Sequence, residues 1–191
     1  MSGHLYYLMG ASGSGKDSLL QGCRQRLEHS HNVFIAHRYI TRAVSAGGEN
    51  HVHLTESEFE LRKNNGMFCM HWASHGHLYG IGKEVEIWVA QGHRVIINGS
   101  RGHLAEAKER FKSITPIMVT VETEQLKKRL IQRGRESLTE IDQRLKQHAS
   151  LLHLLQDDSM QYIDNNNSLE AGIDALMKII TTESNLSLAE T

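Results

Sequence analysis

The chain has 191 residues, of which 39% are apolar and 23% are charged, and its formal net charge is −1 at pH 7. These values are typical of one soluble domain with a substantial core, and they argue against a nucleic-acid-binding surface, which normally carries a basic excess. The sequence contains no membrane-length apolar run, no signal-peptide pattern and only two cysteines. We therefore expect a cytoplasmic protein with neither a membrane nor a nucleic-acid partner.

A phosphate-binding motif follows the first predicted strand, which covers residues 5–9. The motif is Gly-x-x-x-x-Gly-Lys over residues 10–16, and an apolar stripe after it predicts a helix. Its glycines let the backbone turn tightly and direct N–H groups at an anion, and the helix adds the positive end of its dipole. The loop is thus predicted to bind the phosphates of a nucleoside triphosphate. The expected contacts are Gly10, Ala11, Ser12, Gly13, Ser14, Gly15, Lys16, Asp17 and Ser18.

The residue after the loop lysine departs from the usual motif. Asp17 stands where a Ser or Thr hydroxyl normally contacts Mg²⁺. A carboxylate can also hold a hard cation, directly or through water, so Asp17 is the predicted metal contact. Ser18 is the alternative hydroxyl, but it would need a shifted helix start.

Predicted strands and helices alternate along the rest of the chain. Strands are predicted at 33–36, 67–72, 94–97, 117–121 and 162–163. Residues 37–49 are predicted to form a loop. Helices are predicted from a Thr55/Glu58 capping box to about 64, over 85–92, 102–112 and 125–133, from a Thr139/Asp142 capping box through 155, and after Ser168. This order predicts an α/β fold, a three-layer P-loop NTPase domain with a mostly parallel central sheet.

Arginines in two predicted loops supply the positive charge that phosphoryl transfer needs. Arg133 and Arg135 flank Gly134 between two helices, which is typical of a mobile lid over phosphates, although a solvated basic turn is the alternative. Arg38 and Arg42 are candidates for holding an acceptor phosphate, with a surface ion pair as the alternative for each. No acidic residue is an obvious general base, which favours an ionised phosphate over a sugar hydroxyl as the acceptor.

Several segments together resemble the guanylate kinase group. They are Thr41-Arg42 with Gly48-Glu49, Trp72-Ala73 with Tyr79-Gly80, and Arg129-Leu130 through Glu136 with Arg144-Leu145. The group's guanine-reading glutamate and Ser/Thr are replaced here, its acidic pair on the central strand is absent, and a second phosphate arginine and a downstream tyrosine are missing. The replacing residues are His71, Ile81, Asn98 and Ser100. The resemblance implies an acceptor site that has lost its guanine readers.

The sequence is more similar to the ribose 1,5-bisphosphate phosphokinase family, whose own pattern includes Asp17 after the lysine. The similar segments cover nearly the whole chain and are 13–20, 39–42, 48–51, 79–82, 98–101 and 133–136. This resemblance implies transfer of the γ-phosphoryl group of ATP, with Mg²⁺, to the 1-phosphate of ribose 1,5-bisphosphate. The product would be 5-phosphoribosyl 1-diphosphate, in phosphonate degradation.

The resemblance and the positions of the residues together imply roles. Asn98 and Ser100 are expected to orient metal-bound water, and Arg101 is assigned to an acceptor phosphate because it lies at a strand end, where ligands gather in open α/β sheets. The expected catalytic set is Lys16, Arg133, Arg135 and Arg144. The expected substrate contacts are Arg42, Tyr79, Arg101, Asn98, Ser100 and His71.

We expect a single kinase domain over residues 1–182, with a guanylate-kinase-like acceptor insertion at 37–82, a helical lid at 129–145 and a frayed tail at 183–191. A nucleoside monophosphate kinase of the guanylate type is the alternative enzyme. An interaction module without catalysis is disfavoured by the intact phosphate loop, and a regulatory P-loop ATPase is a further alternative. The His-x-His pairs at 51–53 and 75–77 are weak indications of a zinc site because no cysteine pair or Glu-x-x-His accompanies them.

Overall fold

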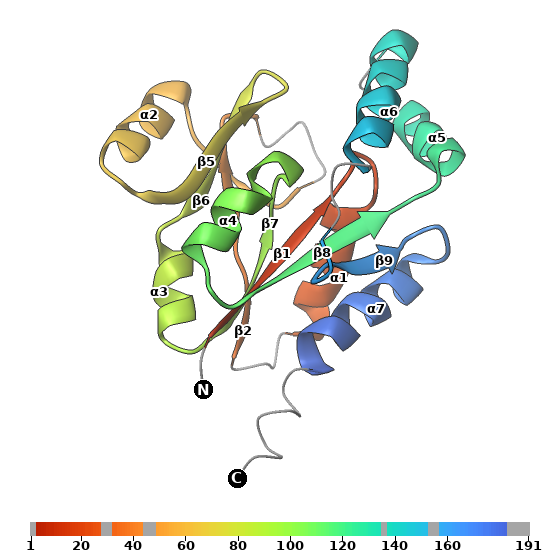
Figure 1. Ribbon diagram of the computed structural model, residues 1–191. Helices are drawn as coiled ribbons and strands as arrows, with labels where there is room; N and C mark the ends of the chain where they lie inside the picture. Colours follow the sequence, from red (N-terminus) through yellow and green to blue (C-terminus); the bar gives the residue numbers. More distant parts are fainter. Residues whose placement is uncertain (1–2, 28–31, 44–48, 135–136, 153–156, 183–191) are drawn as a thin grey trace.

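The structure is a computed structural model that describes residues 3–27, 32–43, 49–134, 137–152 and 157–182. Its centre is a five-stranded sheet in the order β2-β7-β1-β8-β9, in which every neighbouring pair is parallel (Figure 1). The mostly parallel sheet predicted from the alternation of elements is therefore observed. The strands are β1 His4–Gly10, β2 Val33–Ile35, β7 Arg94–Asn98, β8 Ile114–Thr120 and β9 Gln161–Asp164.

Successive side chains of β1 point to opposite faces of this sheet, because the side-chain period of a strand is two. Leu5, Tyr7 and Met9 enter a core that also holds side chains of α3 and α4. Tyr6 and Leu8 enter a second core with side chains of α1 and α7. The sheet thus separates two helical layers. The helices are α1 Lys16–Arg26, α3 Glu84–Ala90, α4 Leu104–Arg110 and α7 Leu169–Thr182.

A smaller four-stranded sheet, ordered β4-β3-β6-β5, stands beside the carboxyl edge of the central sheet together with α2 (Figure 1). The prediction that 37–49 is wholly a loop is wrong, because Arg38–Ile40 forms β3 and pairs antiparallel with β6. Only three residues long, β3 is stabilised by a strand some 40 positions away, which local sequence does not reveal. The elements are β3 Arg38–Ile40, β4 Val52–His53, α2 Glu56–Asn64, β5 Phe68–Ser74 and β6 His77–Gly82.

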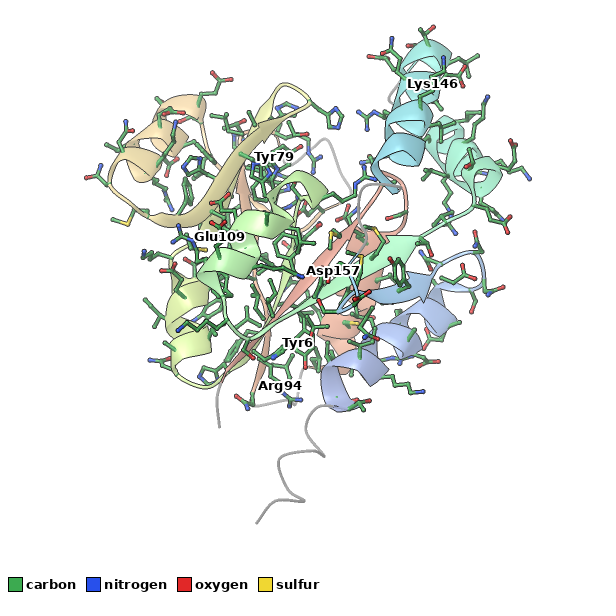
Figure 2. All side chains as sticks on the ribbon, in the orientation of Figure 1. Tyr6, Tyr79, Arg94, Glu109, Lys146 and Asp157 are labelled. Atoms are coloured by element: carbon green, nitrogen blue, oxygen red, sulfur yellow. The ribbon has the colours of Figure 1, made fainter. Side chains whose placement is uncertain are left out.

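A pair of helices, α5 Thr123–Arg133 and α6 Leu138–Leu152, projects from the opposite side of that edge (Figure 1). Figure 2 shows Lys146 on this pair and Tyr79 on the smaller sheet, with the strand ends between them. Gly134 ends α5 in the left-handed conformation, with φ 64°. None of the helices among the described residues is both long and apolar enough to cross a lipid bilayer.

The helix α6 begins two residues earlier than the sequence predicts. Ser137 and Glu140 form the capping box, with the Ser137 amide donating to Glu140 Oε2 at 2.7 Å and the Glu140 amide donating to Ser137 Oγ at 3.3 Å. Thr139 and Asp142 fit the same pattern, so spacing alone could not choose between them. Asp142 instead forms an ion pair with Lys127 of α5 at 3.1 Å.

Several other boundaries differ slightly from the predictions, and two of them concern α4 and β8. A 3₁₀ turn, Arg101–His103, precedes α4 where one continuous helix is predicted. The strand β8 begins at Ile114, before Pro116, rather than at Ile117. The predicted tail at 183–191 and the end of the helix predicted through 155 lie outside the described residues.

Candidate active site

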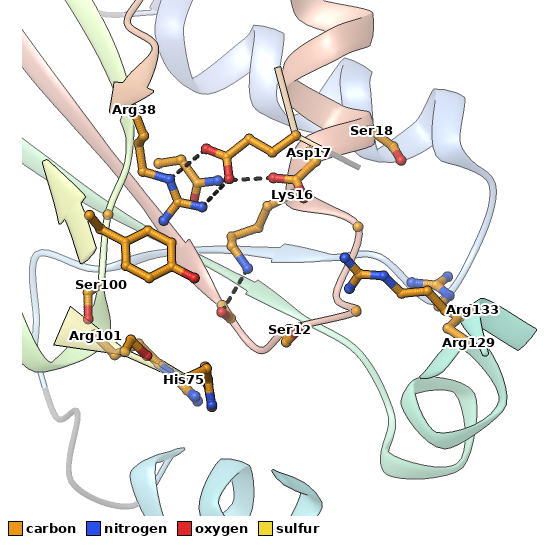
Figure 3. Close-up of a pocket in the computed structure, with 18 of the residues that line it drawn as sticks. Ser12, Lys16, Asp17, Ser18, Arg38, His75, Ser100, Arg101, Arg129 and Arg133 are labelled. Atoms are coloured by element: carbon orange, nitrogen blue, oxygen red, sulfur yellow. Dashed lines mark hydrogen bonds and ion pairs between the residues drawn. The ribbon is translucent and has the colours of Figure 1, made fainter. Parts of the chain in front are cut away.

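The carboxyl ends of the parallel strands open into a cavity of about 640 Å³. Its walls come from the phosphate loop and the end of β7, from the smaller sheet, and from α5 (Figure 3). Ligands of open α/β sheets bind at this edge. The lining residues from the smaller sheet and its loops are Arg38, Arg42, Glu49, Trp72, Ser74, His75 and Tyr79. Those on the α5 side of the cavity are Arg129, Gln132, Arg133, Asn165 and Leu169.

The phosphate loop joins β1 to α1 and depends on glycines at two strained positions. Gly13 and Gly15 have φ values of 86° and 92°, which disfavour any residue with a side chain. A Cβ on Gly15 would lie 2.4 Å from Asn165 Nδ2, so the loop also packs too tightly for one. Asn165 in turn donates to the Ser14 carbonyl at 2.7 Å and fixes the loop from beneath.

Lys16 curls over its own loop. Its Nζ donates to the carbonyl oxygens of Gly10 and Ala11, both at 2.8 Å. Burial lowers the pKa of Lys16 to about 8, and the nearby guanidinium groups of Arg38 and Arg101 act in the same direction. A bound phosphate supplies negative charge that favours the ammonium form, so the pKa of Lys16 should rise when an anion occupies the loop.

Asp17 contacts the end of β7. Asn98 Nδ2 donates to Asp17 Oδ1 at 3.0 Å, and Asn98 is only 2% exposed. The Oδ1 atom of Asn98 is one of two buried side-chain nitrogen or oxygen atoms without a hydrogen-bond partner in the described part of the chain. An orphaned amide oxygen beside a carboxylate is a donor set that fits Mg²⁺ or its water ligands. Ser18 lies on the same turn but points away from Lys16 and Arg38 (Figure 3).

The segment after β7 is fixed from below by Tyr7. The Tyr7 hydroxyl donates to the Ser100 carbonyl at 2.8 Å and accepts from the Ser100 amide at 3.0 Å. Burial, the main cause, raises the pKa of Tyr7 well above its ordinary value, so the hydroxyl keeps its proton. A Cβ on Gly99 would lie 2.2 Å from the Tyr7 ring, which explains the glycine. Arg101 follows Ser100 at the start of the 3₁₀ turn and lines the cavity (Figure 3).

Glu49 pairs with two arginines on the side of the cavity formed by the smaller sheet. Arg38 Nε donates to Glu49 Oε1 at 2.5 Å, and Arg38 Nη2 pairs with Oε2. Arg42 Nη2 lies 3.7 Å from Glu49 Oε2, and Arg42 Nε is the second buried atom without a partner among the described residues. His51 bonds the carbonyls of Arg42 and Glu49 at 2.9 Å. The Arg42 Nε–H therefore has no acceptor among the described residues.

Arg129 connects α5 to the phosphate loop. Its Nη2 donates to the Asn165 carbonyl at 2.8 Å, and Figure 3 shows it beside Arg133. The helix pair can thus place guanidinium groups near bound phosphates. Arg129 lies in the segment that resembles the guanylate kinases. Nothing in the sequence singles out Asn165, because its role depends on a contact with Ser14, 151 residues away.

The structure brings most of the predicted site residues into one cavity, but not all. Ala11 and Ser14 are buried, at 4% and 1% exposure, and neither of them lines the cavity. His71 is exposed on the opposite face of β5 from Trp72, because side chains alternate along the strand, and it does not line the cavity. Arg144 lies on α6 and does not line the cavity either, and Arg135 falls outside the described residues.

The remaining predicted residues line the cavity. A surface ion pair is the alternative that the sequence leaves open for Arg38, and the structure shows an ion pair that is buried inside the site. Trp72, Glu49 and Arg129 were recognisable only as parts of family-like segments. The predicted residues that line the cavity are Gly10, Ser12, Gly13, Gly15, Lys16, Asp17, Ser18, Arg42, Tyr79, Asn98, Ser100, Arg101 and Arg133.

Comparison with known proteins gives the class first. The sequence pattern of the guanylate kinase family matches residues 2–183. The crystal structure of guanylate kinase from Anaplasma phagocytophilum has a TM-score of 0.71 at 22% identity and covers 95% of this chain and 86% of that one, which shows a shared fold. The fold and the site thus define a P-loop phosphotransferase of the guanylate kinase class.

Curated relatives then give the particular family. Ribose 1,5-bisphosphate phosphokinase PhnN of Thiobacillus denitrificans is 44% identical and covers 94% of this chain and 93% of its own length. The PhnN proteins of Psychromonas ingrahamii and Desulfomicrobium baculatum are 45% and 50% identical and cover 95% and 74% of this chain, and 91% and 75% of their own lengths. The chain therefore belongs to the ribose 1,5-bisphosphate phosphokinase family, within the guanylate kinase class.

The packing of Gly99 on Tyr7 gives a first prediction. Gly99→Ala should lower the free energy of unfolding by about 1–3 kcal/mol, because the new methyl group overlaps a buried ring. Urea unfolding followed by circular dichroism measures the change. Gly102→Ala is the matched control, since its Cβ would have only Ser100 Oγ at 4.0 Å nearby. Equal stability of the two variants would contradict this account of the strand end.

The lowered pKa of Lys16 gives a second prediction. Above pH 8 the ligand-free lysine loses its proton, so binding of inorganic tripolyphosphate must take one up, and the affinity should fall as pH rises past about 8. Calorimetry in two buffers of different ionisation enthalpy measures the uptake. Protonation of tripolyphosphate itself contributes equally to binding by Lys16→Met. The difference in proton uptake between the two proteins therefore reports on Lys16 alone. If this difference in proton uptake does not change with pH, the lowered pKa of Lys16 is disproved.

Proposed function

We propose that this protein transfers the γ-phosphoryl group of ATP to the 1-phosphate of ribose 1,5-bisphosphate, giving ADP and 5-phosphoribosyl 1-diphosphate. The observation that carries the proposal is the cavity itself, in which the phosphate loop faces arginines of the smaller sheet and arginines of α5. Both carboxylates that line this cavity already have a hydrogen-bond or ion-pair partner. Asp17 is bonded to Asn98, and Glu49 is paired with Arg38. The names of the curated relatives support the same reaction.

An ionised phosphate acceptor accounts for the engaged carboxylates. An oxygen of the acceptor phosphate forms the new P–O bond to the γ-phosphorus, while the bond to the bridging oxygen breaks and ADP leaves with that electron pair. No proton has to be removed from the nucleophile, so a free general base is not needed. A sugar hydroxyl would need such a base.

Lys16 and the α5 arginines are proposed to act on the transferred group. Lys16 contacts the β- and γ-phosphates, and Arg133 stabilises the charge on the equatorial oxygens. Arg135 and Arg144, named with Arg133 from the sequence, would reach the phosphates only if the α5–α6 pair closes over the cavity as a lid spanning about 129–145. The loop glycines and Ser12 hold the ATP phosphates through backbone N–H groups.

The smaller sheet is proposed to hold the acceptor. Arg42 offers its unpaired Nε–H to a phosphate oxygen, Tyr79 supplies a hydroxyl, and Arg101 faces the same space from the end of β7. These three groups belong to different elements, so they converge on one ligand only through the fold. The insertion 37–82 thereby acts as the acceptor subdomain.

Mg²⁺ is proposed to bind beside Asp17. The Asp17 carboxylate and the unpartnered Asn98 Oδ1 suit a hard cation or its water ligands, and Ser100 follows on the same strand end. The ion would neutralise charge on the β- and γ-phosphates when bound. Asn98 at the end of β7 and Ser100 just after it are uncharged. Asp17 thus supplies the negative charge at this point, from the end of the phosphate loop.

A coupled ADP-release assay with Mg²⁺ and equal concentrations of ribose 1,5-bisphosphate and GMP tests the reaction. We expect turnover with the sugar bisphosphate alone, and 5-phosphoribosyl 1-diphosphate as the product. Lys16→Ala should lower kcat on the order of 10²–10³-fold with an unchanged unfolding midpoint, because it removes a contact to the transferred group. Turnover with GMP instead would identify a divergent guanylate kinase.

The metal assignment is tested by comparing Asp17→Asn with Ser18→Ala. Asp17→Asn should raise the Mg²⁺ concentration for half-maximal activity by about 10- to 100-fold, and Ser18→Ala should raise it much less. Binding of Mn²⁺ in the presence of a non-hydrolysable ATP analogue, followed by electron paramagnetic resonance, gives the same comparison without turnover. A larger effect of Ser18→Ala would assign the metal contact to the hydroxyl.

A further inference from the structure

Four side chains form a continuous stack along the acceptor side of the cavity. The guanidinium carbon of Arg38 lies 5.1 Å from the centroid of the Tyr79 ring. The Tyr79 and Trp72 rings are parallel within 3°, with centroids 5.7 Å apart. Trp72 stacks in turn on His103, with centroids 5.4 Å apart and an angle of 28°. We refer to Arg38, Tyr79, Trp72 and His103 as the acceptor stack.

The register of the smaller sheet fixes the order of this stack. The strands β3, β6 and β5 lie side by side in that order, Tyr79 is opposite Ile40 on β3, and Trp72 is opposite Tyr79. Arg38 is two residues before Ile40 and so points to the same face of the sheet. Arg38 and Trp72 therefore cover the two opposite faces of the Tyr79 ring.

The stack leaves no open face on Tyr79 or Trp72 for a ligand. Tyr79 and Trp72 are each only 7% exposed, although both line the cavity. Stacking on an open aromatic face contributes about 1–3 kcal/mol to the binding of a planar nucleobase. In this site the ring edges and polar groups reach the cavity, while the Tyr79 face toward β3 is occupied by a guanidinium group.

Glu49 holds Arg38 in this position. It uses Nε and Nη2 of the guanidinium and leaves Nη1 for another acceptor, and the Arg38 side chain is only 13% exposed. A buried, bidentate pair is far more restricted than a surface ion pair, because both partners are desolvated and fixed in one plane. The cover on Tyr79 is therefore a built part of the site.

We infer that Arg38, held by Glu49, determines acceptor specificity by covering the Tyr79 ring and so excluding acceptors that carry a nucleobase. The inference rests on the proposed function, in which the acceptor is a base-free sugar phosphate. It adds to that function the residue that excludes a nucleoside monophosphate from the same cavity. Arg38 is thus a specificity-determining residue, distinct from the phosphate contacts assigned to Arg42 and Arg101.

The double variant Arg38→Ala/Glu49→Gln tests this inference. It uncovers the ring without leaving a buried unpaired carboxylate, and it keeps the summed charge of Arg38, Glu49 and Arg42 unchanged. The dissociation constants of GMP and of ribose 5-phosphate are measured by calorimetry. We expect the ratio of the two constants to shift by about tenfold or more in favour of GMP, since an exposed ring can stack a base.

The matched control is Arg62→Ala/Glu58→Gln. Arg62 lies 5.3 Å from the centroid of the Tyr39 ring and pairs with Glu58 at 2.9 Å, so it is the same kind of contact outside the cavity. Its ratio of dissociation constants should equal that of the unmodified protein. An equal shift in both double variants would show a general loss of packing and would overturn the inference.

The remaining outcomes separate this inference from the proposed function. If the unmodified protein phosphorylates ribose 1,5-bisphosphate while Arg38→Ala/Glu49→Gln keeps the original ratio, only the inference fails. If the unmodified protein phosphorylates GMP, both fail. Should the double variant not fold, Arg38→Lys is measured in the same way, because it keeps a cation for Glu49 but loses the planar cover; an unchanged ratio there overturns the inference as well.

Discussion

The concentration of positive charge around one cavity is the constraint on which the rest of this structure depends. Lys16, Arg38, Arg42, Arg101, Arg129 and Arg133 all line it, against Asp17 and Glu49. Like charges at such separations repel, and the lowered pKa of Lys16 is a direct consequence of its burial and of this repulsion. The site is therefore built for a polyanion, whose phosphates supply the missing negative charge.

Three of these cations are held by different parts of the fold. Carbonyl oxygens of the phosphate loop hold Lys16, Glu49 holds Arg38, and the carbonyl of Asn165 holds Arg129. These anchors keep the charges apart from one another while their remaining donors face the cavity. A flexible arrangement would let the charges move into solvent, and the preorganisation that phosphoryl transfer requires would be lost.

The sheet places these anchors. All of its neighbouring strands are parallel, so the ends of β1, β7 and β8 meet at one edge, and Tyr7 on β1 can clamp Ser100 after β7. The smaller sheet reaches the same edge through β3 and β6, and the helix pair reaches it through Arg129 and Arg133. The enzyme class thus follows from three parts of the chain that converge on one point.

The sequence by itself determined the phosphate loop, the parallel α/β architecture and the family. Glycine positions, the lysine and the alternation of apolar segments act locally, and local rules read them correctly. It also placed most lining residues of the cavity, because they lie next to the loop or at the ends of predicted strands. The sequence predicts the capping box of α6 two residues too late, because two overlapping residue pairs satisfy the same spacing rule.

Only the tertiary structure decided which side chains meet. The register of β5 turns Trp72 toward the cavity and His71 away from it, and a one-residue difference in position therefore separates a site residue from a surface residue. The short strand β3 exists because β6 pairs with it, and that pairing places Arg38 over Tyr79. Such contacts join residues dozens of positions apart, so their energies depend on the folded arrangement and leave no local pattern in the sequence.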